Sequence, residues 1–395
     1  MLFGVVLGAV IASCGGDDDT VAPGTGGGGS GGTGGKGGAG TGGSTSTGGG
    51  GSGGATAGSS GTAGSAGSAA TDGGGGASSN DASDGGQTLV QRGEYLVKHV
   101  AACGDCHTPR TNMGALDMTK WLAGVPNFAD IDPGSTTQGS VSSKNLTPHA
   151  TGLLSWTDTQ IKQAFLEGVS KDGTALFPIM PYFVFHNMAE RDADAIVAYL
   201  RTIPPIDNAI PARQPLGFPF PLPAQPVPTA YIPSPTIPST DPNYASAMRG
   251  KYLAGHVGVC MECHTEPSAQ GTPIPLDVNK LFLGNRVFHS AGFGLPPGFP
   301  ADIYTRNLTP HANGIAGWTA AMVRTALKQG IDKDGIPLCP PMPAGPMQAF
   351  GGLTDQDALD IGNYIVNLAP RDNGVIPNCV PPAPPDGGAS DASHE

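Results

Sequence analysis

The sequence contains Cys103-Gly104-Asp105-Cys106-His107, and later a second stretch of the same form, Cys260-Met261-Glu262-Cys263-His264. Both read Cys-x-x-Cys-His, a pattern typical of covalent haem attachment. Two thiols at this spacing can form thioethers with the two vinyl groups on one porphyrin edge, and the adjacent His can bind the iron. The two stretches therefore predict two covalently bound c-type haems, with His107 and His264 as proximal iron ligands.

Two other interpretations of paired cysteines fit this spacing less well. A four-cysteine zinc site places its second pair about 15–20 residues after the first, and Cys260 lies much further along the chain than Cys106. A thioredoxin-like dithiol needs a strand followed by a helix, whereas both motifs lie in helical patterns. Zinc and dithiol chemistry remain the less favoured alternatives.

Composition and charge limit the classes of protein that the chain can represent. It has 395 residues, including 63 Gly and 38 Pro, and a formal net charge of −12. Gly and Pro are concentrated in biased segments, and the rest is long enough for two domains that each bury a core around a cofactor. The acidic excess lies mainly in the two tails. No basic stretch favours nucleic acid as a partner.

The first residues resemble an export signal. Residues 1–13 include an apolar run that is too short to span a membrane and is similar to the hydrophobic part of a secretory signal. Ile11-Ala12-Ser13-Cys14 resembles a bacterial lipobox, which implies a lipid anchor on Cys14. No Lys or Arg precedes the run, so either the true start lies upstream or the apolar run is fortuitous. Because c-type haem attachment also implies export, we expect a periplasmic lipoprotein, with the outer membrane favoured over the inner.

Three segments have compositions that disfavour a packed core. Residues 14–88 are almost wholly Gly, Ser, Thr, Ala and Asp, and they are predicted to form a disordered tether. Residues 204–243 are rich in Pro without a helical period, which predicts a semi-rigid connector that separates two cores. Residues 374–395 are rich in Pro, Gly and Asp, and we expect this flexible tail to fray apart from Cys379.

Between these segments the same motifs occur twice, in residues 89–203 and 244–373, here called the first and second repeats. Each repeat opens with apolar residues at helical spacing, starting at Leu89 in the first. Thr157, with Gln160 three residues on, predicts a capped helix, and a last helix is expected over about 189–201. Thr354 predicts the matching last helix of the second repeat, to about Leu368. The pattern is that of a duplicated helical haem module.

Each repeat also supplies a candidate for the second axial ligand. Met180 and Met342 occupy equivalent places in the repeats, and both stand between prolines, which discourage regular helix. A Met thioether closes the iron, raises its potential and favours electron transfer. Met180 and Met342 are therefore predicted ligands, with core packing as the alternative. Met188 and Met347 compete with them, but these two do not correspond in the repeats.

Several histidines are weaker candidates for iron ligation. The recurring ones are expected to hydrogen-bond to the backbone or to a haem propionate, because those that precede the Cys pair by four residues are poorly placed to reach the opposite haem face. Two unmatched histidines are expected near the surface. The recurring set is His99, His149, His256 and His311, and the unmatched pair is His186 and His289.

Gly93 and Gly250 recur in the middle of the first helix of each repeat. Gly costs about 1 kcal/mol relative to Ala in a helix interior, so a close helix crossing is expected at both places. Tyr199 and Tyr364, in the last helices, have the size to fill the notch that each Gly leaves.

The sequence resembles a dihaem class I cytochrome c, and more closely the cytochrome c subunits of bacterial membrane-associated alcohol and gluconate dehydrogenases. The resemblance rests on Arg-Gly-x-Tyr-Leu, Cys-x-x-Cys-His-Thr, Asn-Leu-Thr-Pro, Gly-x-x-x-Trp, Asp-Gly and Met-Pro-Tyr. In the first repeat these stand at residues 92–96, 103–108, 145–148, 152–156, 172–173 and 180–182. The second repeat follows the pattern less fully, with Ala344 in the place of Tyr182.

This resemblance implies two tandem all-α cytochrome domains, His/Met ligation, and relay of electrons from a dehydrogenase to a downstream cytochrome or oxidase rather than catalysis. Those subunits usually carry three haems, whereas this sequence holds two attachment motifs. Two alternatives remain: a dihaem peroxidase with one open iron, and a haem-based sensor. The matched pair of Met residues argues against the peroxidase.

Cys339 and Cys379 are the two cysteines left once Cys14 and the haem motifs are assigned. Because export implies an oxidising compartment, they are predicted to form a disulfide that holds the C-terminal tail beside Met342. Two unrelated thiols are the alternative.

Overall fold

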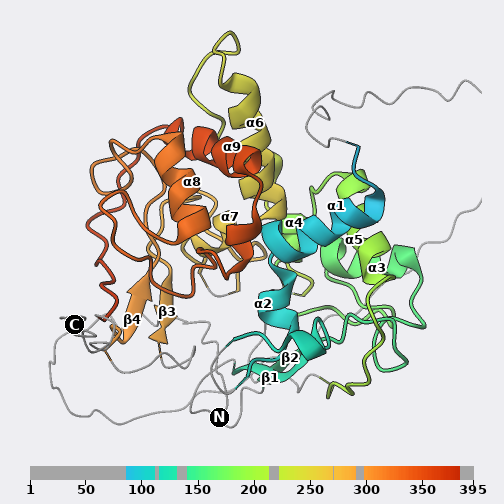
Figure 1. Cartoon of the computed structure of the whole chain (residues 1–395). Helices are drawn as coiled ribbons and strands as arrows, with labels where there is room; N and C mark the ends of the chain where they lie inside the picture. Colours follow the sequence, from blue (N-terminus) through green and yellow to red (C-terminus); the bar gives the residue numbers. More distant parts are fainter. Residues whose placement is uncertain are drawn as a thin grey trace, which may run out of the picture. The chain divides into compact units, whose positions relative to one another are not determined.

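The computed structural model describes residues 86–111, 115–130, 140–212, 222–269, 271–290 and 298–382. This part of the chain is rich in helix and has few strands (Figure 1). Its α-helices are α1 (Leu89–Tyr95), α2 (Cys103–His107), α3 (Asp158–Glu167), α4 (Tyr182–Phe185), α5 (Glu190–Leu200), α6 (Tyr244–Tyr252), α7 (Cys260–Cys263), α8 (Ala320–Gln329) and α9 (Asp355–Val366). Short 3-10 turns occupy Met118–Lys120, Thr229–Tyr231 and Ala349–Gly352. None of the helices described is long and apolar enough to cross a membrane.

Each repeat also contains a small antiparallel sheet that the expectation of an all-α fold missed. Strand β1 (Val125–Asp130) pairs with β2 (Ser140–Ser143), and β3 (Val287–His289) pairs with β4 (Asp302–Tyr304). In the second sheet Phe288 lies opposite Ile303. Strands β3 and β4 have three residues each, and β1 contains Pro126, so none of these three shows a clear period-two pattern in the sequence.

Side-chain caps set the starts of the long helices. The hydroxyl of Thr157 accepts a hydrogen bond from the Gln160 amide, and the Gln160 side chain accepts one from the Thr157 amide, which confirms the predicted capping box. Thr354 caps α9 by accepting from the amide of Asp357. Helix α3 ends at Gly168, whose φ of 69° is a left-handed conformation that suits Gly.

The two glycines in the first helices lie at close helix crossings, as predicted. A Cβ atom on Gly93 would overlap the carbonyl group of Ala195 and lie 2.9 Å from the Cβ of Tyr199, both in α5. A Cβ on Gly250 would overlap the carbonyl of Asp360 and lie 2.8 Å from the Cβ of Tyr364, both in α9. Helix α1 therefore packs on α5, and α6 on α9, at a distance that only glycine permits.

One cluster of buried apolar side chains runs through both repeats. It includes Leu96 and Val97 of the first repeat, Leu253 of the second, and Val227 and Ile232 of the segment between them, all at most 2% exposed. The expectation that the connector separates two cores is therefore wrong, because the connector contributes its own apolar side chains to a shared core. Leu89 is also not part of the buried face, since it is 46% exposed.

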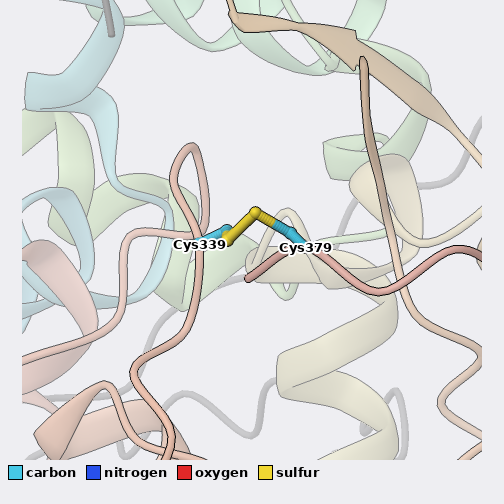
Figure 2. Close-up of a disulfide and its surroundings, with 2 residues drawn as sticks. All are labelled: Cys339 and Cys379. Atoms are coloured by element: carbon cyan, nitrogen blue, oxygen red, sulfur yellow. A yellow bond between two sulfur atoms is a disulfide. The ribbon is translucent and has the colours of Figure 1, made fainter. Parts of the chain in front are cut away.

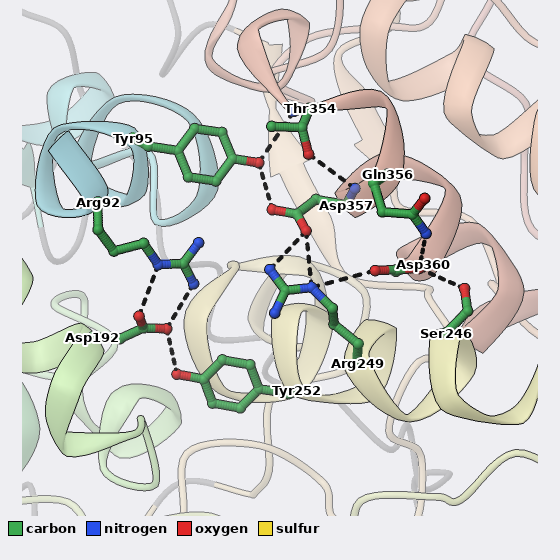
Figure 3. A network of polar contacts seen from close by, with 10 residues as sticks. All are labelled: Arg92, Tyr95, Asp192, Ser246, Arg249, Tyr252, Thr354, Gln356, Asp357 and Asp360. Carbon is green, nitrogen blue, oxygen red and sulfur yellow. Dashed lines mark hydrogen bonds and ion pairs between the residues drawn. The ribbon is translucent and has the colours of Figure 1, made fainter. Parts of the chain in front are cut away.

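Two equivalent polar clusters link the repeats (Figure 3). The guanidinium of Arg92 donates two hydrogen bonds, of 2.8 and 2.9 Å, to the carboxylate of Asp192, which also accepts one of 2.7 Å from Tyr252 of the other repeat.

In the equivalent cluster of the second repeat, the guanidinium of Arg249 donates two hydrogen bonds, of 2.9 and 3.0 Å, to the carboxylate of Asp357. The hydroxyl of Tyr95, from the first repeat, donates to Asp357 at 2.7 Å. Each repeat thus places its tyrosine on the buried carboxylate of the other.

Some predictions fall on residues that the structure leaves out. Cys14, its proposed lipid and the tether up to residue 85 lie outside the described residues. For the tail, residues 374–382 are described, and Ile376 there is only 5% exposed. The other described residues of the tail are mostly exposed and form no helix or strand, so the predicted fraying of the tail stays a prediction.

Candidate haem sites

Each Cys-x-x-Cys-His motif follows a change of helix type. Helix α1 continues into a π-helical segment, Leu96–Val100, and α2 with Cys103 begins three residues later. Helix α6 continues in the same way into Leu253–Val257, which precedes α7. A π-helical turn is rare and is often found at functional sites. Here the same turn precedes both motifs.

The two predicted proximal histidines, His107 and His264, make equivalent hydrogen bonds. In each case Nδ1 of the ring lies 2.8 Å from a backbone carbonyl, that of Lys144 for His107 and that of Arg306 for His264. A carbonyl only accepts, so Nδ1 carries the proton and Nε2 keeps its lone pair for the iron. Burial lowers the pKa of both imidazoles, which favours the neutral form that a metal ligand needs.

The Asn-Leu-Thr-Pro motif positions the carbonyl that holds His107. The side-chain oxygen of Asn145 accepts hydrogen bonds from the amide and hydroxyl of Thr147, at 2.9 and 2.8 Å. Its amide group donates to the carbonyl of Ile206 at 2.8 Å. The turn that follows Lys144 is therefore fixed at both ends.

In the second repeat, the side-chain oxygen of Asn307 accepts from the amide and hydroxyl of Thr309, and its amide group donates to the carbonyl of Arg371. The sequence marked this motif only as a repeated element. In the structure, the residue directly before each motif supplies the carbonyl that accepts from the predicted proximal histidine.

None of the four motif cysteines takes part in a disulfide. Burial raises the pKa of Cys103 and of Cys106 to about 12 and that of Cys260 to about 11, and it also raises the pKa of Cys263. Burial therefore favours the neutral form of all four thiols. No group of three or more His, Cys, Asp or Glu side chains that could hold a metal ion occurs among the described residues.

The four candidate methionines lie in different surroundings. Met180 and Met342 are half-buried and pack against the shared apolar cluster. Met188 is 7% exposed and belongs to that cluster, whereas Met347 is 95% exposed. Exposure makes Met347 a poor iron ligand. Met180 and Met342 therefore remain the equivalent pair that the repeats suggested.

Most of the other histidines contact protein groups within the described part of the chain. His99 contacts the carbonyl of Ala349 at 3.0 Å and His186 that of Leu166 at 3.2 Å. His149 and His311 lie in turns, each 3.6 Å from an aspartate, and His289 contacts Asp302. The exception is His256, whose Nδ1 is buried without a hydrogen-bond partner.

Trp121 is a residue of the first site that sequence reasoning missed. Its ring occupies the space into which a Cβ on Gly104 would point, and its Nε1 donates to the hydroxyl of Tyr199 at 3.1 Å. The second motif has Met261 in place of Gly104, and that side chain is fully buried. The sequence did show that one motif has Gly where the other has Met, and this difference could have indicated that another large side chain packs against Gly104.

Cys339 and Cys379 are joined by a disulfide, with their Cα atoms 6.2 Å apart (Figure 2). This is the pair that the sequence predicted. The bond links the loop of Met342 to the segment that follows α9.

Two Cys-x-x-Cys-His motifs, each with a buried imidazole that hydrogen-bonds through Nδ1, are typical of a c-type cytochrome. Comparison with known proteins confirms the resemblance. The chain is 27% identical over 310 residues to the alcohol dehydrogenase (quinone) cytochrome c subunit of Gluconacetobacter polyoxogenes, which covers 73% of this chain and 57% of that subunit. It is 28% identical over 309 residues to the gluconate 2-dehydrogenase cytochrome c subunit of Pantoea cypripedii, covering 72% and 60%.

A shorter match, 33% identical over 119 residues, is to a diheme cytochrome c-type protein of Cereibacter sphaeroides, covering 30% of this chain and 36% of that protein. No protein-family model matches the chain. The chain spans between 57% and 60% of the length of the two dehydrogenase subunits. It is thus similar over most of its own length to part of each of them.

Proposed function

We propose that this chain is an exported dihaem cytochrome c that relays electrons from a periplasmic or membrane-associated dehydrogenase to a downstream acceptor. The observation that carries the proposal is the equivalence of the two sites. Both proximal histidines are held through Nδ1 by a backbone carbonyl, and both repeats supply a half-buried Met in the same place. The similarity to cytochrome c subunits of dehydrogenases supports a dehydrogenase as the donor.

The proposed roles of the residues follow from these positions. Cys103 and Cys106 attach the first haem, while His107 and Met180 bind its iron. Cys260, Cys263, His264 and Met342 do the same for the second. A bound haem supplies reversible one-electron chemistry, and two axial ligands from the protein leave its iron no position for a substrate. Such a chain carries electrons and catalyses no bond chemistry of its own.

The proposal includes a domain organisation and a location. Residues 89–203 and 244–373 are two tandem class I cytochrome c domains, joined by residues 204–243. Residues 1–13 direct export, Cys14 carries the lipid, and residues 14–88 tether the cytochrome pair to a membrane facing the periplasm, the outer membrane being favoured. The membrane and redox proteins are the partners. The support for this part is the lipobox-like sequence and the Gly- and Ser-rich composition.

Substitution of the methionines tests the proposal. Met180→Ala and Met342→Ala are each expected to remove half of the near-infrared band of Met–Fe(III) ligation. Each is also expected to open one haem to CO and to lower one of the two potentials in a spectroelectrochemical titration. Met347→Ala is the matched control, because its side chain is 95% exposed, and it should change nothing. If the band is unchanged by Met180→Ala or Met342→Ala, the proposed ligand set is wrong.

A further inference from the structure

A buried tyrosine stands at the end of the loop that carries Met180, here residues 176–182. Tyr182, two residues after Met180, is 1% exposed. Its hydroxyl accepts a hydrogen bond of 2.7 Å from the amide of Ala224 and donates one of 3.3 Å to the carbonyl of Leu176. Its ring covers Gly168, where a Cβ would overlap it. Tyr182 thus ties both sides of the Met180 loop to the chain that follows the first repeat.

The second repeat has no tyrosine at the equivalent position. Ala344 stands in its place, and the backbone of Ala344 and Gly345 lies near Gly330, the counterpart of Gly168. The second loop instead contains Cys339, in the position of Phe177, three residues before Met342. The amide of Met342 donates to the carbonyl of Cys339 at 3.3 Å, so the disulfide is attached directly to the turn that presents Met342.

The segments that follow α5 and α9 begin in the same way. Ile206 and Arg371 each donate their amide to the Thr of the Asn-Leu-Thr-Pro motif at 3.1 Å. Two residues later, Asn208 and Asn373 each donate to a backbone carbonyl on the proximal side, those of Ala123 and Leu283. Both segments therefore make their first hydrogen bonds to residues near the predicted proximal histidine of their repeat.

Further along, each of these two segments contacts the loop that carries the candidate methionine of its own repeat, but through a different kind of bond. After the first repeat, Ala224 meets the hydroxyl of Tyr182. After the second, Cys379 is bonded to Cys339. The first contact is a hydrogen bond and the second is a covalent bond. In each repeat, the contact links the segment after the last helix to the loop that carries the candidate methionine.

We propose that the Cys339–Cys379 disulfide takes over in the second repeat the role that Tyr182 has in the first, so that Cys339 and Cys379 are positioning residues for Met342 and Tyr182 is one for Met180. This inference rests on the proposed His/Met ligation. A loop held in its ligating conformation loses less entropy when its thioether binds iron, so a tied loop resists displacement of Met by an external ligand. Loss of the tie weakens one haem's Met ligation and leaves the other unchanged.

Imidazole titration of the oxidised holoprotein tests the inference, because imidazole displaces Met from Fe(III) and the near-infrared band reports the loss. The double variant Cys339→Ala/Cys379→Ala is expected to raise the imidazole affinity of one haem by about tenfold, the effect of ordering roughly one more loop residue. Tyr182→Phe, which keeps the ring and loses the hydroxyl, is expected to raise it about fivefold at the other haem. Combining the variants should affect both haems.

The possible results distinguish a failure of this inference from a failure of the proposed His/Met ligation. If wild-type protein shows the Met–Fe(III) band of one haem or none, the proposed ligation fails. If wild type shows the band of both haems and the double-alanine variant binds imidazole as wild type does, the disulfide does not position Met342. Should that variant take up no haem, wild-type holoprotein is reduced with a phosphine, alkylated at both thiols, reoxidised with ferricyanide and titrated. An unchanged imidazole affinity there likewise overturns the inference.

Discussion

Removing one tyrosine hydroxyl tests whether the repeats form a single structural unit. Tyr252→Phe deletes the hydroxyl that donates to Asp192 at 2.7 Å and that accepts from the amide of Ala189 at 3.1 Å. Asp192 keeps its paired bonds with Arg92. The ring stays in place, so the change removes a contact between the repeats without leaving a cavity.

The expected cost follows from the charge and burial of the acceptor. A hydrogen bond to a charged group contributes about 1.5–3 kcal/mol, and the side chain of Asp192 is only 7% exposed. We therefore expect Tyr252→Phe to lower the free energy of unfolding by about 2 kcal/mol, which in a unit of this size corresponds to about 4 °C in Tm. Tyr95→Phe removes the equivalent bond to Asp357 and should cost about the same.

Denaturation by guanidinium, followed by far-UV circular dichroism on the holoprotein, measures both effects. Tyr231→Phe is the control, because Tyr231 is 51% exposed and a surface change of this kind costs at most about 0.5 kcal/mol. We expect wild type to unfold in one step, since both repeats share one apolar cluster. The reasoning is refuted if wild type unfolds in two separate steps, or if both variants are as stable as the control.

Three further changes have outcomes that follow from single observations. Denatured wild-type protein should retain two c haems per chain through acid–acetone extraction in a pyridine haemochrome assay, and Cys263→Ala should reduce haem incorporation in the second repeat alone. Retention of fewer than two in wild type would contradict the attachment sites. Gly250→Ala should lower the free energy of unfolding by about 3 kcal/mol or more, because the new Cβ overlaps the carbonyl of Asp360. Gly335→Ala is the control, because Gly335 lies in a turn with open space and the substitution tests only the cost of its φ of 80°. Equal losses of stability in the two variants would argue against the tight helix crossing. Burial lowers the pKa of His256 from 6.5 to about 4, so the unfolded chain binds more protons between these values and stability should fall as pH drops through that range. His256→Asn should make unfolding by urea less sensitive to pH between 7 and 4, and an unchanged pH profile would exclude His256 as the source.

The elements that the sequence predicted well are those set by local chemistry. The caps at Thr157 and Thr354 need only residues close together in the chain. The notch at Gly93 and Gly250 was also predictable, because a glycine in a helix interior is costly without a close neighbour. In each case the residue type is explained by a contact that few other side chains can make.

The elements that were missed depend on contacts between distant parts of the chain. Nothing in the sequence around Leu96 or Leu253 distinguishes a π-helical turn from an α-helical one. The bonds from Tyr95 to Asp357 and from Tyr252 to Asp192 join residues of different repeats. The connector was interpreted from its proline content, and that content carries no information about the burial of Val227 and Ile232.

Binding of CO to the fully reduced wild-type holoprotein tests the central claim most directly. If Met180 and Met342 both bind iron, neither haem has an open position, and we expect no stoichiometric CO complex at either haem. Met180→Ala provides the positive control, with one CO bound per chain. One equivalent of CO bound by wild type would show that one iron is open. That result would contradict the assignment of the chain as an electron carrier with two closed haems, and would favour a peroxidase or a haem-based sensor.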